Sequence, residues 1–492
     1  MNFKHRTKEI MLYFLSQQEI EKRVNNREVR IGFIGLGRVG LPLAATLANE
    51  GFNVLGVDVK NEAVAKINTG NSPYPDESGL KELLQKVVAK KTLKATTQIA
   101  AIKEYDLIII SAPTLIRNEE PNIDAVKIVA DELAGNFSPG KIVILESTVP
   151  PLTTQDILGK AIETKVGLKP GRDFGLAYSP ERTQAPQVLR DLKAYPKIIG
   201  GIDEKSTFIV SMVYSTFAPS IIKMHSLVAA EIEKVIENSY RDVNIAFANE
   251  LAQICETYSI DVYELIKAAN SQPYSHILNP GLVGGHCIPM DPYYIISDAS
   301  KRGNTPKLMQ TARDVNESVF QNVVNMIDES SKKTTTAPGV ILRERSDRRI
   351  SETLRSAQGD MSETERLPRK ITVLGLSFKP DVKSFETSHT LKLIHLLKEK
   401  GYEVTVHDPF LDDSTNSITQ QTLSTQRDLY HAIKGSDCVI LSTAHSEYSQ
   451  INFDKVKEIM KGNLIIDIRG MFSPQEVLHS GLRYKGLGRI FL

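Results

Sequence analysis

The feature that most constrains the fold is a strand, a glycine-rich turn and a helix near the start of the chain. Residues 29–34 are apolar apart from Arg30, which is typical of a buried strand, and the G-x-G-x-x-G pattern at 35–40 follows them directly. A helical segment then leads to a second apolar strand at 54–57, which ends at Asp58. This order of strand, turn, helix, strand and acid predicts the first βαβ unit of a doubly wound α/β fold.

The three glycines of the turn suit the binding of a dinucleotide. Gly35 permits the tight turn, Gly37 lets the backbone approach a pyrophosphate, and Gly40 allows the helix to pack close to the strand. Asp58 would accept hydrogen bonds from ribose hydroxyls and repel a 2′-phosphate, so NAD is favoured over NADP. An ordinary tight turn is the alternative, although it does not require the rest of the unit. The predicted cofactor contacts here are Gly35, Gly37, Arg38, Val39, Gly40 and Asp58.

Three more apolar strands follow, at 106–111, 141–145 and 174–178, and a polar segment comes after each of them. Ligands bind beyond the carboxyl ends of the strands in a doubly wound sheet, so these segments are expected at the cofactor edge. Each polar residue there is also explained as a helix cap or turn residue. The predicted site residues of these segments are Thr114, Thr148 and Glu181.

Residues from about 228 to 270 are almost free of glycine and have a helical period, which predicts a long helix. Lys234 and Asn238 are four residues apart and therefore share one face of this helix. A solvated surface lysine is the ordinary alternative for Lys234. A long helix between two α/β units is a natural spine and a natural dimer surface.

The loop at 280–294 combines glycines and prolines with a cysteine, Cys287, which has almost no side-chain bulk upstream of it. A thiol in this setting is open to attack a substrate once a base or a positive charge ionises it. Burial as a small apolar residue is the ordinary alternative. The other two cysteines, Cys255 and Cys438, lie in apolar runs and are predicted to be core residues.

Composition narrows the class of protein. At 492 residues the chain is expected to form two or three domains. Its 60 basic and 59 acidic residues leave no excess charge of the kind that nucleic-acid or membrane-surface proteins carry. The 3 cysteines have no paired spacing, which fits a reducing cytosol, and the apolar run at 10–15 is too short to cross a bilayer. We therefore expect a cytoplasmic protein and predict no metal site.

A second α/β unit is expected from Lys370 onward, after an insertion rich in arginine, serine and acids. Its turn at 375–380 lacks the glycine triplet, so this half is expected to hold something other than a dinucleotide, with Lys379 suited to a phosphate. The predicted fold is α/β, with two Rossmann-like doubly wound domains joined by a central helical spine. The expected segments are an N-terminal extension at 1–27, an NAD-binding domain at 28–210, a central helical and dimerisation domain with the cysteine loop at 211–330, a disordered insertion at 331–369 and a second Rossmann-like domain at 370–492.

Together these motifs resemble the UDP-glucose/GDP-mannose dehydrogenase family, from about Val29 to the C-terminus apart from the insertion. The motifs are the NAD unit, Lys-x-x-x-Asn on the spine, Gly-Gly-His-Cys-Ile-Pro-x-Asp and Gly-x-x-Phe-Lys. The sequences at 146–151, 179–183 and 284–294 are most similar to those of the branch that oxidises UDP-N-acetylhexosamines.

The resemblance implies a homodimer that oxidises the sugar C6 alcohol to a carboxylate with two NAD, for surface polysaccharide precursors. Cys287 would capture the aldehyde and carry a thioester, which water releases. Lys234 would stabilise oxyanion charge, and Glu181 would act as base in thioester hydrolysis. The implied catalytic residues are Cys287, Lys234, Asn238, Asp291, Glu181 and Thr148, and the implied substrate contacts are Glu181, Lys234, Asn238, Gly281, Phe378 and Lys379.

Three alternatives stay open at this point. Glu386 stands where the family usually has an arginine, which makes a nucleotide-sugar or NAD binding protein without turnover an alternative. Within the enzymes, UDP-glucose 6-dehydrogenase is an alternative, and a single-step alcohol dehydrogenase would leave Cys287 structural. The choice between GlcNAc and ManNAc depends on pocket shape, which the sequence does not give.

Overall fold

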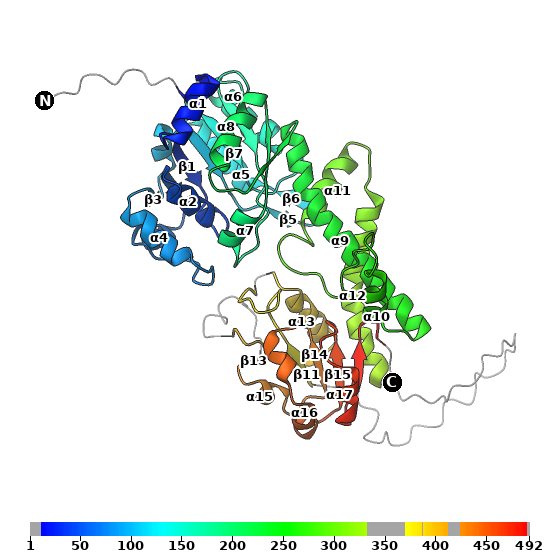
Figure 1. Cartoon of the computed structure of the whole chain (residues 1–492). Helices are drawn as coiled ribbons and strands as arrows, with labels where there is room; N and C mark the ends of the chain where they lie inside the picture. The colour runs from blue at the N-terminus through cyan, green and yellow to red at the C-terminus, as the bar shows by residue number, and fades with distance from the viewer. Residues whose placement is uncertain (1–10, 332–369, 386, 412–423, 490–492) are drawn as a thin grey trace, which may run out of the picture. The chain divides into compact units, whose positions relative to one another are not determined.

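The computed structural model describes residues 11–331, 370–385, 387–411 and 424–489 (Figure 1). The chain divides into two compact units, one within residues 1–241 and 290–309 and the other within 242–289 and 310–492. Residues 332–369 of the predicted insertion, and Glu386, lie outside the described residues. In the four described ranges, no helix combines the length and the apolar character that a bilayer crossing requires.

The first unit is built on an 8-stranded sheet with the strand order β10-β9-β8-β7-β4-β1-β2-β3. The chain leaves β1 towards β2 on one side and later returns to β4 on the other, which makes the sheet doubly wound, as predicted. Neighbouring strands pair parallel except β8 and β9. The strands are β1 (Arg30–Ile34), β2 (Asn53–Val57), β3 (Leu93–Thr96), β4 (Leu107–Ile110), β7 (Ile142–Leu145), β8 (Gly175–Tyr178), β9 (Lys197–Gly201) and β10 (Ile221–Met224), and a separate hairpin consists of β5 (Leu115–Arg117) and β6 (Glu120–Asn122).

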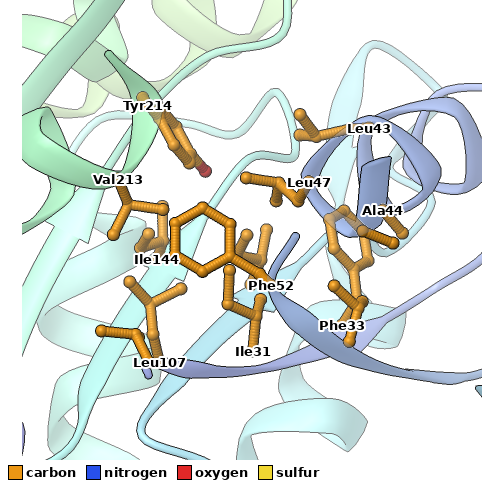
Figure 2. Packing of buried hydrophobic residues seen from close by; sticks show 14 of the residues in the cluster. Ile31, Phe33, Leu43, Ala44, Leu47, Phe52, Leu107, Ile144, Val213 and Tyr214 are labelled. Atoms are coloured by element: carbon orange, nitrogen blue, oxygen red, sulfur yellow. The ribbon is translucent and has the colours of Figure 1, made fainter. Parts of the chain in front are cut away.

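Helices cover both faces of this sheet (Figure 1), because its strands are apolar on both sides. In β4, Leu107 and Ile109 enter one apolar core, whereas Ile108 and Ile110 enter another. Figure 2 shows the first of these cores, in which the ring of Phe52 packs among side chains of β1, α2, β7 and α8. The helices are α2 (Gly40–Asn49), α3 (Asn61–Asn68), α4 (Leu80–Ala89), α5 (Asp124–Ala134), α6 (Lys160–Val166), α7 (Val188–Ala194) and α8 (Glu204–Tyr214).

Residues 11–25 pack into the core shown in Figure 2, although the sequence predicted an N-terminal extension outside the NAD-binding domain there. They form the short turn η1 (Leu12–Phe14) and the helix α1 (Gln17–Asn25). Ile20 and Val24 are four residues apart on α1 and are completely buried. The amphipathic period of this short segment therefore joins it to the first unit.

The second unit contains a 6-stranded sheet with the order β13-β12-β11-β14-β15-β16, in which all neighbours are parallel. Counted along the chain this is the order 3-2-1-4-5-6 of a Rossmann fold, which confirms the predicted second sheet. The strands are β11 (Lys370–Leu374), β12 (Glu403–His407), β13 (Ser424–Gln426), β14 (Cys438–Leu441), β15 (Leu464–Asp467) and β16 (Arg483–Gly486), and the helices are α13 (His389–Glu399), α15 (Leu429–Ile433), α16 (Phe453–Ile459) and α17 (Pro474–His479).

The central helical segment is broken once, where the sequence predicted one long helix to about residue 270. The helix α9 (Leu227–Tyr258) ends because Ser259 takes a left-handed conformation, with φ of 55°. Asp261 then begins a new helix, since its side chain accepts a hydrogen bond from the N–H of Tyr263 at 2.8 Å. The remaining helices of this region are α10 (Val262–Ala269), α11 (Asp291–Lys301) and α12 (Lys307–Ser331).

Candidate active site

The glycine turn after β1 is open only at its second glycine. Gly35 has φ of 94°, and a Cβ on it would lie 2.1 Å from the carbonyl oxygen of Ser111. A Cβ on Gly40 would lie 2.1 Å from the carbonyl oxygen of Gly35, whereas a Cβ on Gly37 would meet no atom within 4 Å. Gly35 and Gly40 therefore serve packing, and the open side of Gly37 has room for a pyrophosphate.

The surroundings of this turn also fit NAD. Val39 precedes α2, and within the described residues its side chain does not cap the helix, so the helix N-terminus is open to a phosphate. Asp58, directly after β2, accepts hydrogen bonds from the N–H groups of Leu36 and Lys60, both at 2.9 Å. Arg38 forms a partly exposed ion pair beside the turn. The acid therefore stands at the turn with part of its acceptor capacity unused.

Two threonines lie at the carboxyl edge of the first sheet. Thr114 and Thr148 are half-buried residues after β4 and β7, which are parallel neighbours. The hydroxyl of Ser147 donates to the carbonyl oxygen of Ala112 at 2.7 Å and ties the two segments together. This is the edge at which doubly wound sheets bind their ligands.

Glu181 follows β8 and is oriented by its own loop. Its Oε1 accepts hydrogen bonds from the N–H groups of Arg182, at 2.7 Å, and Thr183, at 2.8 Å. The guanidinium of Arg182 in turn donates to both carboxylate oxygens of Glu237 on α9, at 3.1 and 3.3 Å. The Glu181 side chain is 9% exposed, so this carboxylate is fixed in direction and largely shielded from water.

Lys234 and Asn238 on α9 form a buried group with Asp291, the first residue of α11. The Nδ2 of Asn238 donates to the Oδ2 of Asp291 at 2.5 Å. Lys234 is 8% exposed and is therefore not the solvated surface lysine of the ordinary alternative. Burial raises the pKa of Asp291 to about 6, because it outweighs the opposing Lys234 charge and the Asn238 hydrogen bond. This group thus contains a carboxyl that exchanges a proton near neutral pH.

Residues 280–289 of the cysteine loop belong to the second unit, where side chains of that unit contact two of its glycines. The N–H of Gly281 donates to the Oδ1 of Asn249 at 2.7 Å, and its carbonyl oxygen accepts from the Nδ2 of the same side chain at 3.2 Å. Gly285 has φ of 89° and lies against the ring of Phe378, since a Cβ there would be 3.0 Å from that ring. The loop therefore depends on glycine at positions where a side chain would collide.

Cys287 is exposed at the end of this loop, whereas the other two cysteines, Cys255 and Cys438, are buried as predicted. Lys379 is half-buried and follows Phe378 in the turn after β11. The second unit therefore brings the cysteine loop and the Phe378 turn together, although about ninety residues separate them along the chain.

The turn after β11 is closed by Asp408, which follows β12 as the acid of the first unit follows β2. Its Oδ2 accepts from the N–H groups of Leu376 and Ser377 at 2.7 and 2.8 Å, and from the Ser377 hydroxyl at 3.0 Å. The same oxygen lies 2.9 Å from the Nε2 of His445, whose Nδ1 accepts from the N–H of Asp381 at 3.0 Å. The pair of His445 and Asp408 thus anchors the segment that directly follows Lys379.

The predicted site residues fall into two groups. The first unit holds Gly35, Gly37, Arg38, Val39, Gly40, Asp58, Thr114, Thr148, Glu181, Lys234, Asn238 and Asp291, and the second holds Gly281, Cys287, Phe378 and Lys379. Sequence reasoning missed the buried ionisable residues Glu146, Lys197 and Glu231 of the first unit. The available signals were a charge directly after an apolar strand for Glu146 and a charge at the start of one for Lys197. Glu231 lies three and seven residues before Lys234 and Asn238, so helical spacing alone places it on their face.

Three domain models of one family match the chain. They are the UDP-glucose/GDP-mannose dehydrogenase NAD binding domain at residues 29–218, the central domain at 228–318 and the UDP binding domain at 372–474.

Individual relatives match over almost their whole length. The UDP-N-acetyl-D-mannosamine dehydrogenase of Pyrococcus horikoshii is 30% identical over 94% of this chain and 99% of its own. The one of Campylobacter jejuni is 34% identical over 88% of this chain and 99% of its own. A solved structure of the UDP-D-ManNAc dehydrogenase from Pyrococcus horikoshii has a TM-score of 0.80 at 30% identity and covers 94% of this chain and 99% of its own. These matches confirm NAD as the cofactor, and the chain belongs to the UDP-glucose/GDP-mannose dehydrogenase family as an NAD-dependent nucleotide-sugar dehydrogenase.

Proposed function

We propose that the protein oxidises the C6 alcohol of a UDP-N-acetylhexosamine, in the ManNAc or GlcNAc form, to the uronic acid. The relatives described above are named for UDP-N-acetyl-D-mannosamine, which supports that sugar as the first one to test. Within the chain, the observation that carries the proposal is the buried group of Lys234, Asn238 and Asp291. It supplies a positive charge, an amide and a proton-exchanging carboxyl at one place.

The proposed reaction has two oxidations and one hydrolysis. The glycine turn at 35–40 and Asp58 would hold NAD, which would supply the hydride acceptor for both oxidations of C6. Between the two oxidations, the thiolate of Cys287 adds to the aldehyde carbon as a thiohemiacetal, and the second oxidation converts this into a thioester. Water then cleaves the thioester, which releases the carboxylic acid and restores the thiol. Covalent capture keeps the aldehyde from escaping between the steps.

The other site residues are given roles according to the charge that develops in each step of the reaction. Lys234 stabilises negative charge on the C6 oxygen and favours the ionised thiol. Asn238 and Asp291 orient a substrate oxygen or a water, and Glu181 takes the proton of the water that attacks the thioester. Thr148 is proposed to lie near the nicotinamide ring. The proposed contacts to the nucleotide sugar in the second unit are Gly281, Phe378 and Lys379.

A panel of nucleotide sugars tests the substrate. UDP-N-acetylmannosamine, UDP-N-acetylglucosamine, UDP-glucose and GDP-mannose compete for NADH formation, and the proposal expects one of the two acetamido sugars to have the highest kcat/KM with two NADH per sugar. A preference for UDP-glucose overturns the substrate, and one NADH with an aldehyde product overturns the second oxidation. Saturable binding without any NADH supports the binding protein that Glu386 suggests.

Cys287→Ser tests the covalent step. We expect sugar and NAD binding to be retained and turnover to be lost, because an alcohol at this position is far less ionised than a thiol. Cys255→Ala, which changes a buried cysteine, is the matched control and should keep wild-type turnover. A wild-type rate for Cys287→Ser would remove the thioester from the mechanism.

We also propose that the chain forms a homodimer through α9, in the cytoplasm, and that its product supplies surface polysaccharide precursors. Ile236, Tyr240, Phe247 and Ile254 are exposed large side chains whose spacings of four and seven residues place them on one face of α9. An apolar stripe of this kind supports a protein interface. Light scattering tests the dimer: a monomeric mass for the wild type refutes it, and Phe247→Glu should shift the mass towards the monomer.

A further inference from the structure

A buried ionic cluster lies beside Glu181 in the first unit. Lys197, at the start of β9, places its Nζ 2.8 Å from the Oε2 of Glu146 and 3.5 Å from the Oε2 of Glu181. The same ammonium donates to the carbonyl oxygen of Pro180 at 3.3 Å. The hydroxyl of Tyr214, at the end of α8, donates to the other carboxylate oxygen of Glu146. One cation therefore joins two carboxylates that follow the neighbouring strands β7 and β8.

The charges in this cluster are poorly screened, because the side chains of Lys197 and Glu146 are only 5% and 1% exposed. Burial raises the pKa of Glu146 in spite of the opposing charge of Lys197. Burial would lower the pKa of Lys197, but the charges of Glu146 and Glu181 together leave that pKa raised. The lysine therefore stays protonated, and the two carboxylates compete for its single positive charge.

Glu181 has one oxygen that its own loop does not use. Its Oε1 accepts two backbone N–H groups, whereas its Oε2 is buried and accepts no hydrogen bond from the described residues. A buried acceptor of this kind is ordinarily satisfied by water. In the proposed hydrolysis, the water that attacks the thioester must pass a proton to such an oxygen.

Stability alone does not account for the cluster. A buried ion pair is often no more stable than apolar residues of the same volume, because both ions lose their hydration. Replacing Lys197 and its partners by apolar residues would therefore cost the fold little. What apolar residues would not provide is a fixed positive charge beside Glu181, the residue that acts as the base in the proposed hydrolysis.

We propose that Lys197, anchored by Glu146 and Tyr214, is a positioning residue that places a positive charge beside Glu181 and fixes its Oε2 as the acceptor for a proton of the attacking water. This inference rests on the proposed function, in which Glu181 is the base. In the step concerned, the water oxygen bonds to the thioester carbon, the carbon–sulfur bond breaks, and the sulfur of Cys287 leaves as the thiolate. One water proton passes to Glu181, and Lys197 keeps its charge throughout.

Two variants change the charge beside Glu181 in opposite directions. Lys197→Met leaves two carboxylates facing each other. The acid limb, which is the fall of the hydrolysis rate at low pH, should therefore move to higher pH by about one unit. At a fixed pH on this limb the rate is then roughly tenfold lower. Glu146→Gln removes the competing carboxylate and moves the limb to lower pH. Lys197→Arg restores the limb towards that of the wild type. Lys193→Met, which changes an exposed lysine of α7, is the matched control and leaves the limb unchanged.

The assay uses the full chain with NAD and UDP-N-acetyl-D-mannosamine from pH 5.5 to 9. Stopped-flow absorbance separates the NADH burst from the steady state, and mass spectrometry of quenched protein measures the thioester on Cys287. Lys197→Met should accumulate this thioester at low pH. A loss of rate that is uniform over pH, or shifts of the same sign in Lys197→Met and Glu146→Gln, contradict the inference. If Lys197→Met does not fold, Glu146→Gln decides, since an unchanged acid limb overturns the inference.

A further variant, Glu181→Gln, separates this inference from the proposed function. If Glu181→Gln keeps the wild-type acid limb, the assignment of Glu181 as the base is wrong and the inference falls with it. If Glu181→Gln abolishes hydrolysis while Lys197→Met keeps the wild-type limb, only the role of Lys197 is overturned.

Discussion

Replacing Glu231 by glutamine should remove a pH dependence from the stability of the first unit. The Oε2 of Glu231 accepts from the N–H of Leu152 at 2.6 Å, and its Oε1 accepts from the N–H and the hydroxyl of Thr154 at 2.8 and 2.6 Å. Leu152 has a left-handed φ of 71°, so this carboxyl holds a strained turn at the entrance to the π-helix η3 (Thr154–Gly159). Burial outweighs the hydrogen bonds and raises the pKa of Glu231 to about 7.

The sign of the effect follows from the raised pKa of Glu231. An ordinary glutamate has a pKa of 4.5, so between 4.5 and about 7 the folded state holds a proton that the unfolded state has released. The stability that this proton provides is fully present below pH 4.5 and is lost as the pH rises through 7. A shift of about 2.5 units corresponds to about 3 kcal/mol, of which about 2 kcal/mol is lost between pH 5.5 and 8. Glutamine does not titrate, so the variant lacks this loss.

The measurement is the pH dependence of local opening and of Tm for the wild type and Glu231→Gln between pH 5.5 and 8. Amide exchange in peptides that contain Leu152 and Thr154 gives the free energy of local opening. The contribution of Asp291 to stability also falls as the pH rises, but it is the same in both proteins and cancels in the difference between them. Glu132→Gln, at an exposed position of α5, is the control and should follow the wild type. Parallel curves for the wild type and Glu231→Gln refute the reasoning.

Three further predictions concern the glycine turn, the cysteine loop and the buried carboxyl. Gly37→Ala should weaken NAD binding roughly tenfold in titration calorimetry with an unchanged Tm. Gly40→Ala should lower both the NAD affinity and the Tm, because its Cβ would meet a backbone oxygen at 2.1 Å. Asn249→Ala leaves a buried peptide N–H and carbonyl without their partner and should cost about 2–4 kcal/mol in urea unfolding, with a higher KM for the sugar; an unchanged KM would show that the loop does not need this clamp. Lys234→Met should raise the pKa of Asp291 further above its usual range, because the lysine charge lowers that pKa. The fall of the first oxidation rate at low pH should then move to higher pH. An unmoved pH profile would contradict the assignment of Lys234 and Asp291 to the reacting site.

The parts of this molecule that follow a short-range rule were predictable from the sequence. The run at 107–110 is apolar at every position because alternate residues enter two different cores, and such runs predict a doubly covered parallel sheet. Helical spacing placed Asn238 on the right face, but only the fold shows that its amide meets Asp291. Lys197 had no local signal beyond a charge at the start of an apolar strand, since its partners come from other strands and helices. The break at Ser259 was missed because helical periodicity continues on both sides of it.

The chain contains two Rossmann-like sheets, but the acids that follow their second strands differ in how many hydrogen bonds they can offer to a dinucleotide. Asp408 accepts 5 hydrogen bonds from the described residues, from the N–H groups of the turn and of Phe410, the Ser377 hydroxyl and a histidine. Four of these bonds fall on Oδ2 and one on Oδ1, so within the described residues a single acceptor site, on Oδ1, is left for a ribose hydroxyl. Asp58 accepts only two N–H groups from the described part of the chain, which leaves sites for two ribose hydroxyls. The difference arises in the turn, because Ser377 stands where the first unit has Gly37. Its hydroxyl takes one acceptor site of the acid, whereas Gly37 has no side chain that could do so.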